Sequence, residues 1–321
     1  MNLTKKQKRF LFGKSMSLTA LALLIILTVV VGSIISLGWF ANRDTADANG
    51  VSVTAKEERF ELAVSGEQVL PFANDSTIIT YLNSVAGGSY EKRASTEREH
   101  TSILCRVINE KPHIAGSDEL APGAFGRISF DIVLQAGDPV RDYEISLDYL
   151  PLDLVAGVPQ AVDNADIDDL KDLISGHILL FNTRSALING GYYYSDRITN
   201  KRFVFSPSEH TPSVESDGIH YTVEFYFIWP ATFAQLALKQ DSPKLHLHPV
   251  FQTEALRLEM LNYIIENQDE FFRNLGQGIN FSAESFEETF FVELSDGYNT
   301  ADQFIGDKAH FLVICSTVNP V

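Results

Sequence analysis

One uncharged, apolar stretch constrains this chain of 321 residues more than any other feature. It runs from Ser15 to Asn42 without a single Asp, Glu, Lys or Arg. A helix of ~20 consecutive apolar residues crosses a bilayer. No later part of the sequence offers a comparable run. We therefore expect a transmembrane helix or uncleaved signal anchor over residues 15–42, followed by a separate domain.

The charges beside this stretch predict its direction. Residues 1–14 form a basic tail that contains Lys5, Lys6, Lys8, Arg9 and Lys14 and no acid. Clustered basic residues next to a first span stay on the cytoplasmic side. We expect a single-pass protein of the cell membrane, with its N-terminus cytoplasmic and its C-terminal domain extracellular. Trp39 and Phe40 would then lie at the outer membrane interface, where aromatic rings are stabilised.

The same stretch has a second interpretation, a long secretory signal peptide. Small residues at Ser36 and Gly38 would allow cleavage near Gly38, and the protein would then be secreted. The apolar core of a signal peptide is usually ~7–15 residues long, so we favour a retained anchor. Residues 43–50 are polar and short, and we expect them to be a linker to a domain over residues 51–321.

The part of the chain after the span is strongly acidic. All 42 Asp and Glu residues lie at Asp44 or later, whereas six of the 25 Lys and Arg residues lie at Arg43 or earlier. This leaves 19 basic against 42 acidic residues, a formal net charge of −23. Such a charge repels nucleic acid, so we expect no nucleic-acid partner.

Alternating apolar and polar residues predict a mainly antiparallel β domain. The clearest runs are residues 127–134 and 143–149, which are separated by a loop with Gly-Asp-Pro. We expect these two runs to pair as one hairpin with a single wet face. Shorter strands are expected at residues 51–55, 60–64, 103–108, 178–181, 203–205, 221–227, 290–294 and 310–317.

Three segments change to helical spacing, around residues 161–175, 231–238 and 253–275. Acidic residues crowd the start of the first segment, and Gly176 is expected to end it. A turn is expected at Asp296-Gly297. The fold class predicted for residues 51–321 is therefore mainly β with helical insertions (α+β), arranged as an antiparallel, jelly-roll-like β-sandwich.

Two short runs resemble a known family. Residues 39–53 read Trp-Phe-Ala-Asn-Arg-Asp-Thr-Ala-Asp-Ala-Asn-Gly-Val-Ser-Val, directly after the apolar span. This run resembles the start of TasA/camelysin-type bacterial surface proteins. Residues 121–126, Ala-Pro-Gly-Ala-Phe-Gly, resemble that family's entry to a central strand. The resemblance implies a jelly-roll-like sandwich at a bacterial cell surface, and it extends to about residue 130.

Three further runs resemble uncharacterised single-span bacterial ectodomains with the same entry. They are residues 176–181, Gly-His-Ile-Leu-Leu-Phe, residues 227–230, Phe-Ile-Trp-Pro, and residues 298–306, Tyr-Asn-Thr-Ala-Asp-Gln-Phe-Ile-Gly. This second resemblance implies no activity.

The two cysteines, Cys105 and Cys315, each lie in a strand-like apolar run. Outside the cell a disulfide between them would persist and would join an early strand to the last one. The alternative, which we favour, is two buried thiols that act as small hydrophobic side chains.

Two groups of residues are candidates for metal binding, although we expect neither metal nor cofactor. A metalloprotease has been ascribed to camelysin-like proteins, but this chain has no His-Glu-x-x-His motif. His246 and His248 are the only close histidine pair. On a strand, both imidazoles would point to one face, and the carboxylate of Glu254 would complete a metal site. We favour a surface histidine pair, because a third ligand is missing.

The second metal candidate is the oxygen-rich run of Asp163, Asp166 and Asp168, which is similar to a calcium loop. It lacks the glycine and the distal glutamate of such a loop, so we favour an acidic helix start. Residues 192–194, three tyrosines, and Trp229 are candidates for stacking on sugar or peptide. Packing of these aromatic rings in or beside a core is the interpretation that we favour.

No nucleophile elbow, P-loop or dinucleotide fingerprint occurs in the sequence. We therefore expect a membrane-tethered extracellular bacterial surface protein with a structural, assembly or adhesion role and no catalytic activity. Its expected partners are the membrane and, at the cell surface, either a second copy of the chain or another protein. The strand at Val51–Ala55 would pair with the open sheet edge of such a neighbour. Two alternatives stay open: a surface hydrolase or metal-dependent enzyme, and an accessory or sensor subunit of a membrane complex.

Overall fold

The computed structural model describes residues 46–48, 51–53, 60–64, 102–111, 120–155, 158–162, 166–188, 191–275 and 290–321. The chain divides into two compact units, Met1–Glu58 and Arg59–Val321. The predicted span over residues 15–42, including Trp39 and Phe40, lies outside the described residues. Within the described ranges, no helix is long and apolar enough to cross a membrane.

The first unit contains a short hairpin. Its strands are β1 (Ala46–Ala48) and β2 (Val51–Val53), which pair antiparallel. Part of the expected linker is therefore a strand, and the predicted strand at Val51 already has one partner within its own chain.

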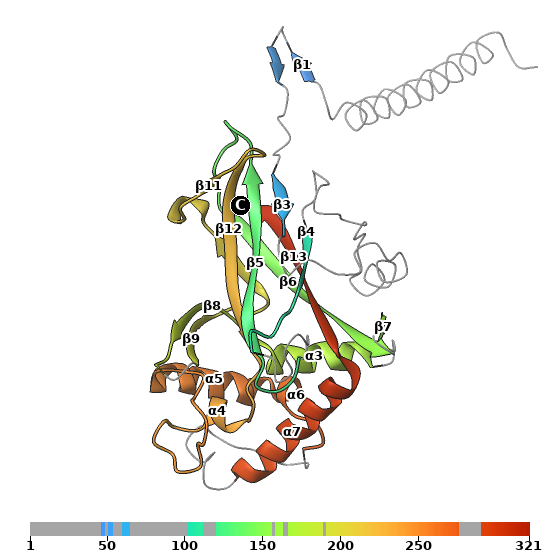
Figure 1. Ribbon diagram of the computed structural model, residues 1–321, viewed down its shortest axis with the longest axis vertical. Coiled ribbons are helices and arrows are strands. Elements are labelled where there is room, and N and C mark those ends of the chain that lie inside the picture. The colour runs from blue at the N-terminus through green and yellow to red at the C-terminus, as the bar shows by residue number, and fades with distance from the viewer. Residues whose placement is uncertain are drawn as a thin grey trace, which may run out of the picture. The chain divides into compact units, whose positions relative to one another are not determined.

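The second unit is built on two antiparallel sheets (Figure 1). Their strands are β3 (Glu61–Ala63), β4 (Ser102–Arg106), β5 (Phe125–Leu134), β6 (Tyr143–Val155), β7 (Val158–Ala161), β8 (Leu179–Ala186), β9 (Tyr192–Arg197), β10 (Arg202–Phe205), β11 (Ser213–Val214), β12 (Ile219–Ile228) and β13 (Phe311–Pro320). One sheet has the order β10-β6-β13-β4, with β7 beside β6. The other has the order β3-β5-β12-β8-β9, with β11 beside β12.

The helices gather at one end of the sheets (Figure 1). They are α3 (Ile167–His177), α4 (Ala234–Ala237), α5 (Glu254–Glu266), α6 (Gln268–Phe271) and α7 (Phe291–Lys308). A separate 3-10 turn, η2 (Pro207–Glu209), follows β10, whose Phe205 pairs with Tyr143 of β6. The described part is thus mainly antiparallel β with a few helices, which confirms the predicted α+β class. Helices occur in all three predicted segments, although the third segment is divided at Asn267 into α5 and α6.

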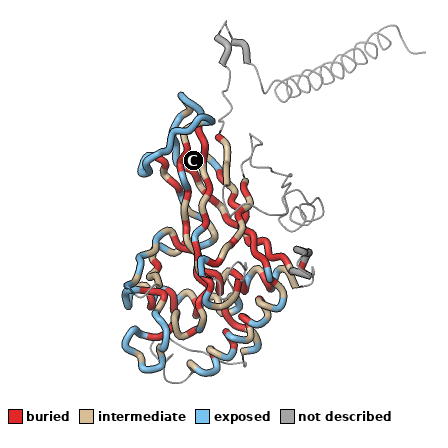
Figure 2. The backbone as a smooth tube through the Cα atoms, in the orientation of Figure 1, coloured by how far each residue is buried: buried red, intermediate tan, exposed pale blue. Residues whose placement is uncertain are grey.

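Both sheets contribute side chains to one hydrophobic core. Ile128 and Phe130 of β5 and Ile145 and Tyr149 of β6 belong to the same buried cluster. Buried residues alternate with more exposed ones along the long strands (Figure 2), as expected when one face of a strand packs on a core. A second cluster joins the helices to β8 and β9, with Phe181, Phe233 and Tyr298 among its fully buried rings.

The predicted hairpin of residues 127–134 and 143–149 is wrong. Both runs are strands, β5 and β6, but β5 pairs with β3 and β12, whereas β6 pairs with β7, β10 and β13. The connection between them therefore crosses from one sheet to the other. Alternation predicts a strand with one buried face, and that face is equally well buried against an opposite sheet.

The predictions for residues 290–297 are also wrong. The expected strand at 290–294 and the expected turn at Asp296-Gly297 both lie at the start of α7. Leu294, Tyr298, Ala301 and Ile305 are buried at helical spacing, so the helix buries one continuous apolar face.

Gly176 lies inside α3 and does not end it. A Cβ atom at Gly176 would lie 2.1 Å from the carbonyl oxygen of Glu270, so only glycine lets α6 approach α3 this closely. This glycine is explained by helix packing and not by helix termination.

Candidate functional site

The strongest candidate site surrounds Arg197, the last residue of β9. Its guanidinium carbon lies 3.7 Å from the ring centroid of Tyr263 on α5, which is cation–π stacking. Arg197 is half-buried, and no ion pair joins it to a carboxylate in the part of the chain that the structure describes. Burial lowers the pKa of Arg197, although the Tyr263 phenol and, less strongly, the charges of Glu259 and Glu270 act in the opposite direction. A half-buried guanidinium without a carboxylate partner is unusual, because burial of an unpaired charge is costly.

Two cavities meet at this arginine, and Arg197 and Thr199 line both. The first cavity has a volume of about 290 Å³ and is also lined by Tyr149, Ser175, Asn200, Lys201, Tyr263 and Glu270. The second has a volume of about 280 Å³ and is also lined by Ser195, Asp196, Phe251, Leu256, Glu259 and Met260. We call the two together the Arg197 cleft. It lies where β9 and the turn after it pack against α5 and α6.

The wall of the Arg197 cleft is held by hydrogen bonds between helices. The hydroxyl of Tyr263 on α5 donates to Oε2 of Glu270 on α6 at 2.8 Å. Burial and this hydrogen bond raise the pKa of Tyr263 to about 12. The phenol therefore stays neutral at physiological pH, and its ring presents a fixed face to Arg197.

Strained backbone surrounds the Arg197 cleft. Only four non-glycine residues in the described part of the chain have a positive φ, and three of them line the cleft: Asp196 (φ 58°), Asn200 (φ 53°) and Lys201 (φ 54°). Asn200 and Lys201 are the central residues of a tight turn, closed by a hydrogen bond from the Arg202 nitrogen to the Thr199 oxygen at 3.2 Å. Left-handed backbone is unfavourable for residues with a Cβ atom, though less so for Asn and Asp than for Lys, and such strain clusters at functional sites.

This turn also places a second cation in the cleft. Nζ of Lys201 lies 5.3 Å from the ring centroid of Tyr149. The carbonyl oxygen of Lys201 accepts a hydrogen bond from the backbone nitrogen of Leu147 on β6 at 2.8 Å. The first cavity thus has two cations, Arg197 and Lys201, and one carboxylate, Glu270.

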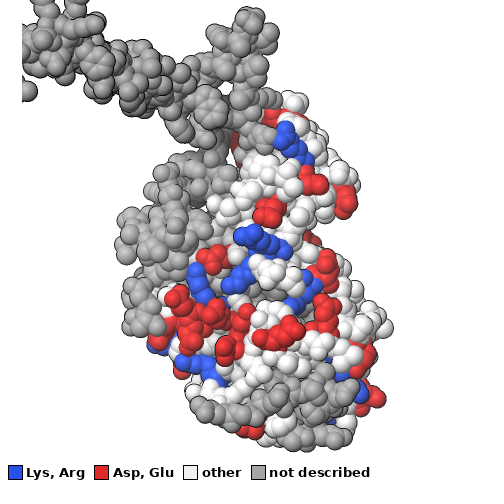
Figure 3. All heavy atoms as spheres, turned by 180° about the vertical axis from the view of Figure 1, so that it is seen from behind, with Lys and Arg blue, Asp and Glu red and all other residues white. Residues whose placement is uncertain are grey.

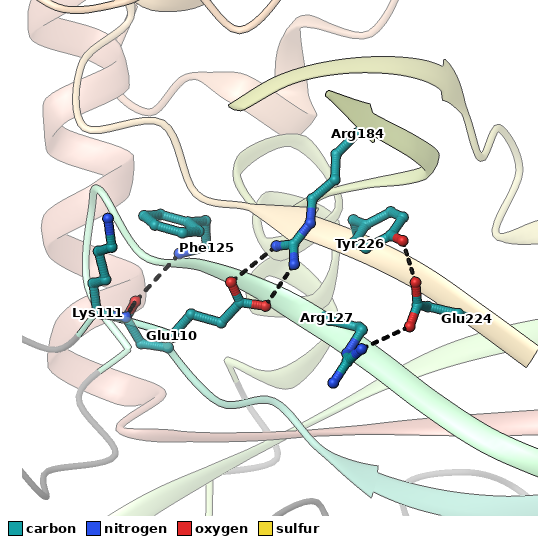
Figure 4. Close-up of polar contacts among 8 residues, drawn as sticks. Glu110, Lys111, Phe125, Arg127, Arg184, Glu224 and Tyr226 are labelled. Carbon is teal, nitrogen blue, oxygen red and sulfur yellow. Dashed lines mark hydrogen bonds and ion pairs between the residues drawn. The ribbon is translucent and has the colours of Figure 1, made fainter. Parts of the chain in front are cut away.

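A second arginine on the same hairpin lies in a different environment (Figure 4). Arg184 of β8 donates a hydrogen bond from Nη1 to Oε2 of Glu110 at 3.0 Å, and Nη2 forms an ion pair with Oε1 of the same carboxylate at 2.9 Å. The guanidinium also lies over the rings of Tyr192 and Tyr226. Burial lowers the pKa of Arg184, but the hydrogen bond and charge of Glu110 outweigh it and leave the pKa raised.

Next to Arg184, Arg127 forms an ion pair with Glu224 at 3.0 Å, and Glu224 also accepts a hydrogen bond from the Tyr226 hydroxyl (Figure 4). We call this group the Arg184 surface. Its charges are satisfied within the protein, so its geometry indicates a structural role.

The described residues contain one fully buried His–Asp pair. Nδ1 of His177 lies 2.6 Å from Oδ1 of Asp302, which also accepts a hydrogen bond from Nε1 of Trp229 at 2.6 Å. The other ring nitrogen, Nε2, donates to the carbonyl oxygen of Phe271 at 3.0 Å. Both ring nitrogens are engaged inside the core, so this pair joins α3, α6 and α7 and is closed to a substrate.

Within the described ranges, the candidate ligands His246, His248 and Glu254 are not brought together as one group. His246 and His248 are exposed and lie in the loop between α4 and α5, not on a strand. Their expected partner, Glu254, forms a close ion pair with Arg257 at 2.6 Å. The hydrogen bond from Arg257 is the largest cause of the lowered pKa of Glu254 and outweighs the opposite effect of burial.

The acidic run is placed at the start of a helix, as we favoured. Asp166 precedes α3 and forms an ion pair with Lys308 at 2.9 Å. Asp168 is exposed in the first turn of α3. Asp163 lies outside the described residues.

No disulfide joins Cys105 and Cys315, although they lie on neighbouring strands. Cys105 on β4 is in register with Ile314 of β13, and both belong to the same core cluster. Cys315 is the next residue of β13, so its side chain points to the opposite face of the sheet. A disulfide needs Cβ atoms that face each other. Burial, followed by the nearby Cys315 sulfur, raises the pKa of Cys105 well above its ordinary value.

The aromatic candidates have different fates. Trp229 and Tyr194 are buried in the two cores, as expected for packed rings, whereas Tyr192 is half-buried under Arg184. Sequence reasoning missed the Arg197 cleft. Its one sequence signal is Thr199-Asn200-Lys201, a polar run between two short strands, which is too common to identify a site.

Acidic and basic side chains are interspersed on the face shown in Figure 3, without a large region of one sign. Comparison of the chain with protein-family models, curated proteins and solved structures finds no match.

Proposed function

We propose that this chain is a membrane-tethered extracellular surface protein with a structural, assembly or adhesion role, and that it acts by binding a partner in the Arg197 cleft. The N-terminal basic tail and the apolar stretch over residues 15–42 support the tether. The resemblance of residues 39–53 to the start of TasA/camelysin-type proteins supports a bacterial cell surface.

The proposed scaffold is an antiparallel, jelly-roll-like β-sandwich. The shared core of β5, β6, β12 and β13 supports this architecture, because inward-facing residues of both sheets fill the space between them. The cleft lies at the end of this scaffold where the helices gather, so a partner would meet a site on rigid elements.

The single observation that carries the proposal is the half-buried guanidinium of Arg197, which has no carboxylate partner among the residues that the structure describes. A planar guanidinium matches a carboxylate in geometry and charge, and a ligand carboxylate would supply the missing partner. Glu270 in one cavity and Glu259 in the other would attract an amine on the same ligand. The geometry therefore favours a partner that carries a carboxylate with an amine nearby, as peptides do.

Two observations favour binding over catalysis. The thiol of Cys105 is buried with a raised pKa, which keeps it from acting as a nucleophile. The His177–Asp302 pair has both ring nitrogens engaged in the core, so it does not resemble an accessible general base.

Calorimetric titration of the full-length chain in detergent micelles tests the binding. The probes are dialanine, its N-acetyl form, which keeps only the carboxylate, and its C-terminal amide, which keeps only the amine. We expect dialanine to bind most tightly, the N-acetyl form more weakly, and the amide not at all. Arg197→Gln should weaken dialanine binding at least tenfold, since a charged hydrogen bond contributes roughly 1.5–3 kcal/mol.

Arg202→Gln is the matched control, because Arg202 lies five residues from Arg197, is exposed and lines neither cavity. Among the described residues, its only ion pair is a long one, 3.8 Å to Glu144. Equal binding of the amide and the free dipeptide would reject carboxylate recognition, as would unchanged binding by Arg197→Gln. Labelling of a tag after Val321 in intact cells tests the topology, and labelling only after lysis would reject it.

A further inference from the structure

A second polar cluster lies at the start of β12, away from the Arg197 cleft. It consists of Glu215 and Asp217, in the turn between β11 and β12, and His220 on β12. One ligand atom from each of the three residues lies within 4.8 Å of the others. The carboxylates are exposed, but the His220 side chain is only 7% exposed.

The imidazole of His220 is oriented from behind by a carboxylate. Nδ1 lies 3.3 Å from Oδ2 of Asp131 on the neighbouring strand β5. The hydroxyl of Thr222 donates to Oδ1 of the same carboxylate at 2.7 Å. Asp131 and Thr222 are cross-strand partners in the register of β5 and β12. A hydrogen bond from Nδ1–H to Asp131 leaves Nε2 directed at Asp217, whose Oδ1 lies 2.9 Å away.

The backbone of the turn is held in one conformation. The backbone nitrogen of Glu215 donates to the carbonyl oxygen of Gly218 at 2.9 Å, and Nε2 of Gln135 donates to the backbone carbonyl oxygen of Asp217 at 2.8 Å. Gly218 has a φ of 157°, and a Cβ atom there would lie 2.7 Å from Val133 Cγ1 and 2.8 Å from the Leu134 oxygen. This close packing against β5 fixes the backbone from which the side chains of Glu215 and Asp217 extend.

We propose that Glu215, Asp217 and His220 form a binding site for one divalent transition-metal ion, with Asp131 as the residue that positions His220. Metal-bound histidines usually donate their second N–H to a carboxylate, and Asp131 holds that place before any ion is bound. Nε2 of His220 and one oxygen from each of Asp217 and Glu215 would be the ligands, with water in the remaining positions.

The ligand set selects the class of ion. An imidazole nitrogen together with carboxylate oxygens suits zinc, cobalt or manganese, whereas calcium prefers oxygen ligands only. Binding places the ion between Nε2 and Asp217 Oδ1, and the proton that joins these atoms in the protonated form leaves to solvent. The bound ion would fasten the β11–β12 turn to β5 through Asp131.

Titration of the metal-free, full-length chain with Co²⁺ tests the site, because the visible absorption of Co²⁺ reports nitrogen and oxygen ligation directly. Competition with Zn²⁺ then gives the zinc affinity. We expect one ion per chain, with loss of the signal in Glu215→Gln and His220→Gln. Glu215 is exposed, so its substitution leaves folding intact even if that of the buried His220 does not. Asp131→Asn should weaken binding roughly 10- to 100-fold without removing the signal.

The double variant His246→Gln and His248→Gln is the matched control, because it removes the histidine pair that the sequence suggested and leaves this cluster unchanged. Its Co²⁺ spectrum and stoichiometry should equal those of the unaltered chain. Loss of the signal in this control, or an unchanged signal in Glu215→Gln, would overturn the proposal. Absence of stoichiometric Co²⁺ binding in the unaltered chain would overturn it as well.

Discussion

Two arginines on the β8–β9 hairpin differ in one respect that separates a structural surface from a candidate binding site. Arg184 and Arg197 are both half-buried and both stack on tyrosine rings. Arg184 has the carboxylate of Glu110 at hydrogen-bond distance, whereas Arg197 has no carboxylate within ion-pair distance among the described residues.

The pKa shifts of the two arginines have opposite directions for this reason. At Arg184 the hydrogen bond and charge of Glu110 overcome burial and raise the pKa, whereas at Arg197 burial prevails and lowers it. The difference teaches that burial of a guanidinium is not by itself a sign of function. A buried guanidinium whose partner is missing is the one that a ligand would stabilise.

The largest expected effect is on stability. Arg184→Met should lower the free energy of unfolding by about 2 kcal/mol, because it removes the ion pair with Glu110 and the stacking of the guanidinium on two tyrosine rings, each of which contributes roughly 0.5–1 kcal/mol. Arg197→Met should change it by less than about 0.5 kcal/mol or raise it, because a hydrophobic side chain replaces a desolvated charge. Urea unfolding of the two variants measures both values. An equal loss at the two positions would remove the distinction between them.

A carboxylate introduced beside Arg197 should make it resemble Arg184. Thr199 lines both cavities next to Arg197, and Thr199→Asp would supply an internal partner. We expect about tenfold weaker dialanine binding, equal to about 1.4 kcal/mol, and a gain in stability below about 1 kcal/mol. Thr199→Asn is the uncharged control and should leave binding within about twofold. Similar weakening by both substitutions would mean that shape, not charge, decides binding.

Relief of backbone strain should separate stability from binding. Lys201→Gly removes a left-handed residue and a cation of the cleft, and Asn274→Gly removes a left-handed residue that does not line either cavity. Lys201→Gly should stabilise the fold by about 0.5–1 kcal/mol and Asn274→Gly by less, because Asn tolerates positive φ better than Lys does, and glycine loses more entropy on folding. Only Lys201→Gly should weaken dialanine binding. Thermal unfolding and calorimetry of the two variants check this, and weaker binding by Asn274→Gly would contradict it.

The smallest expected effect is a pH dependence that the two sites share. Tyr226 beside Arg184 and Tyr263 beside Arg197 both have a pKa raised from 10.0 to about 12, by burial and by hydrogen bonds to Glu224 and Glu270. Between these pH values the folded state binds more protons than the unfolded state, so stability is full below pH 10 and falls as pH rises towards 12.

Tyr226→Phe and Tyr263→Phe should each make the loss of stability between pH 10 and 12 less steep, to a similar extent. Urea unfolding at a series of pH values measures this slope. A much larger change for one phenol than for the other would show that the arginine partners also set the tyrosine environments.

Local patterns predicted many of the elements. The alternation of residues 127–134 and 143–149 identified β5 and β6, because the side-chain period of a strand depends only on neighbouring residues. The acids before Leu170 predicted the start of α3 for a similarly local reason, the interaction of negative charge with the first turn. The pattern at 291–308 contained the helical spacing of Leu294, Tyr298, Ala301 and Ile305, which the Gly-containing pair at 296–297 obscured.

The sites were much less predictable than the elements. His246 and His248 are close in sequence but exposed in a loop, whereas His220 meets Asp131 only because β5 and β12 pair. Arg184 and Arg197 have no local feature that distinguishes them, since Glu110 is 74 residues away from Arg184 along the chain.

The sequence by itself determined the apolar stretch, the acidic charge of the rest and the positions of the main strands, since each depends on composition or on periodicity within a few residues. The tertiary structure alone decided which sheet each strand joined, which arginine gained a carboxylate and which histidine met Asp131. These outcomes depend on contacts between distant segments, and a packed core fixes such contacts only when all of its strands and helices are in place.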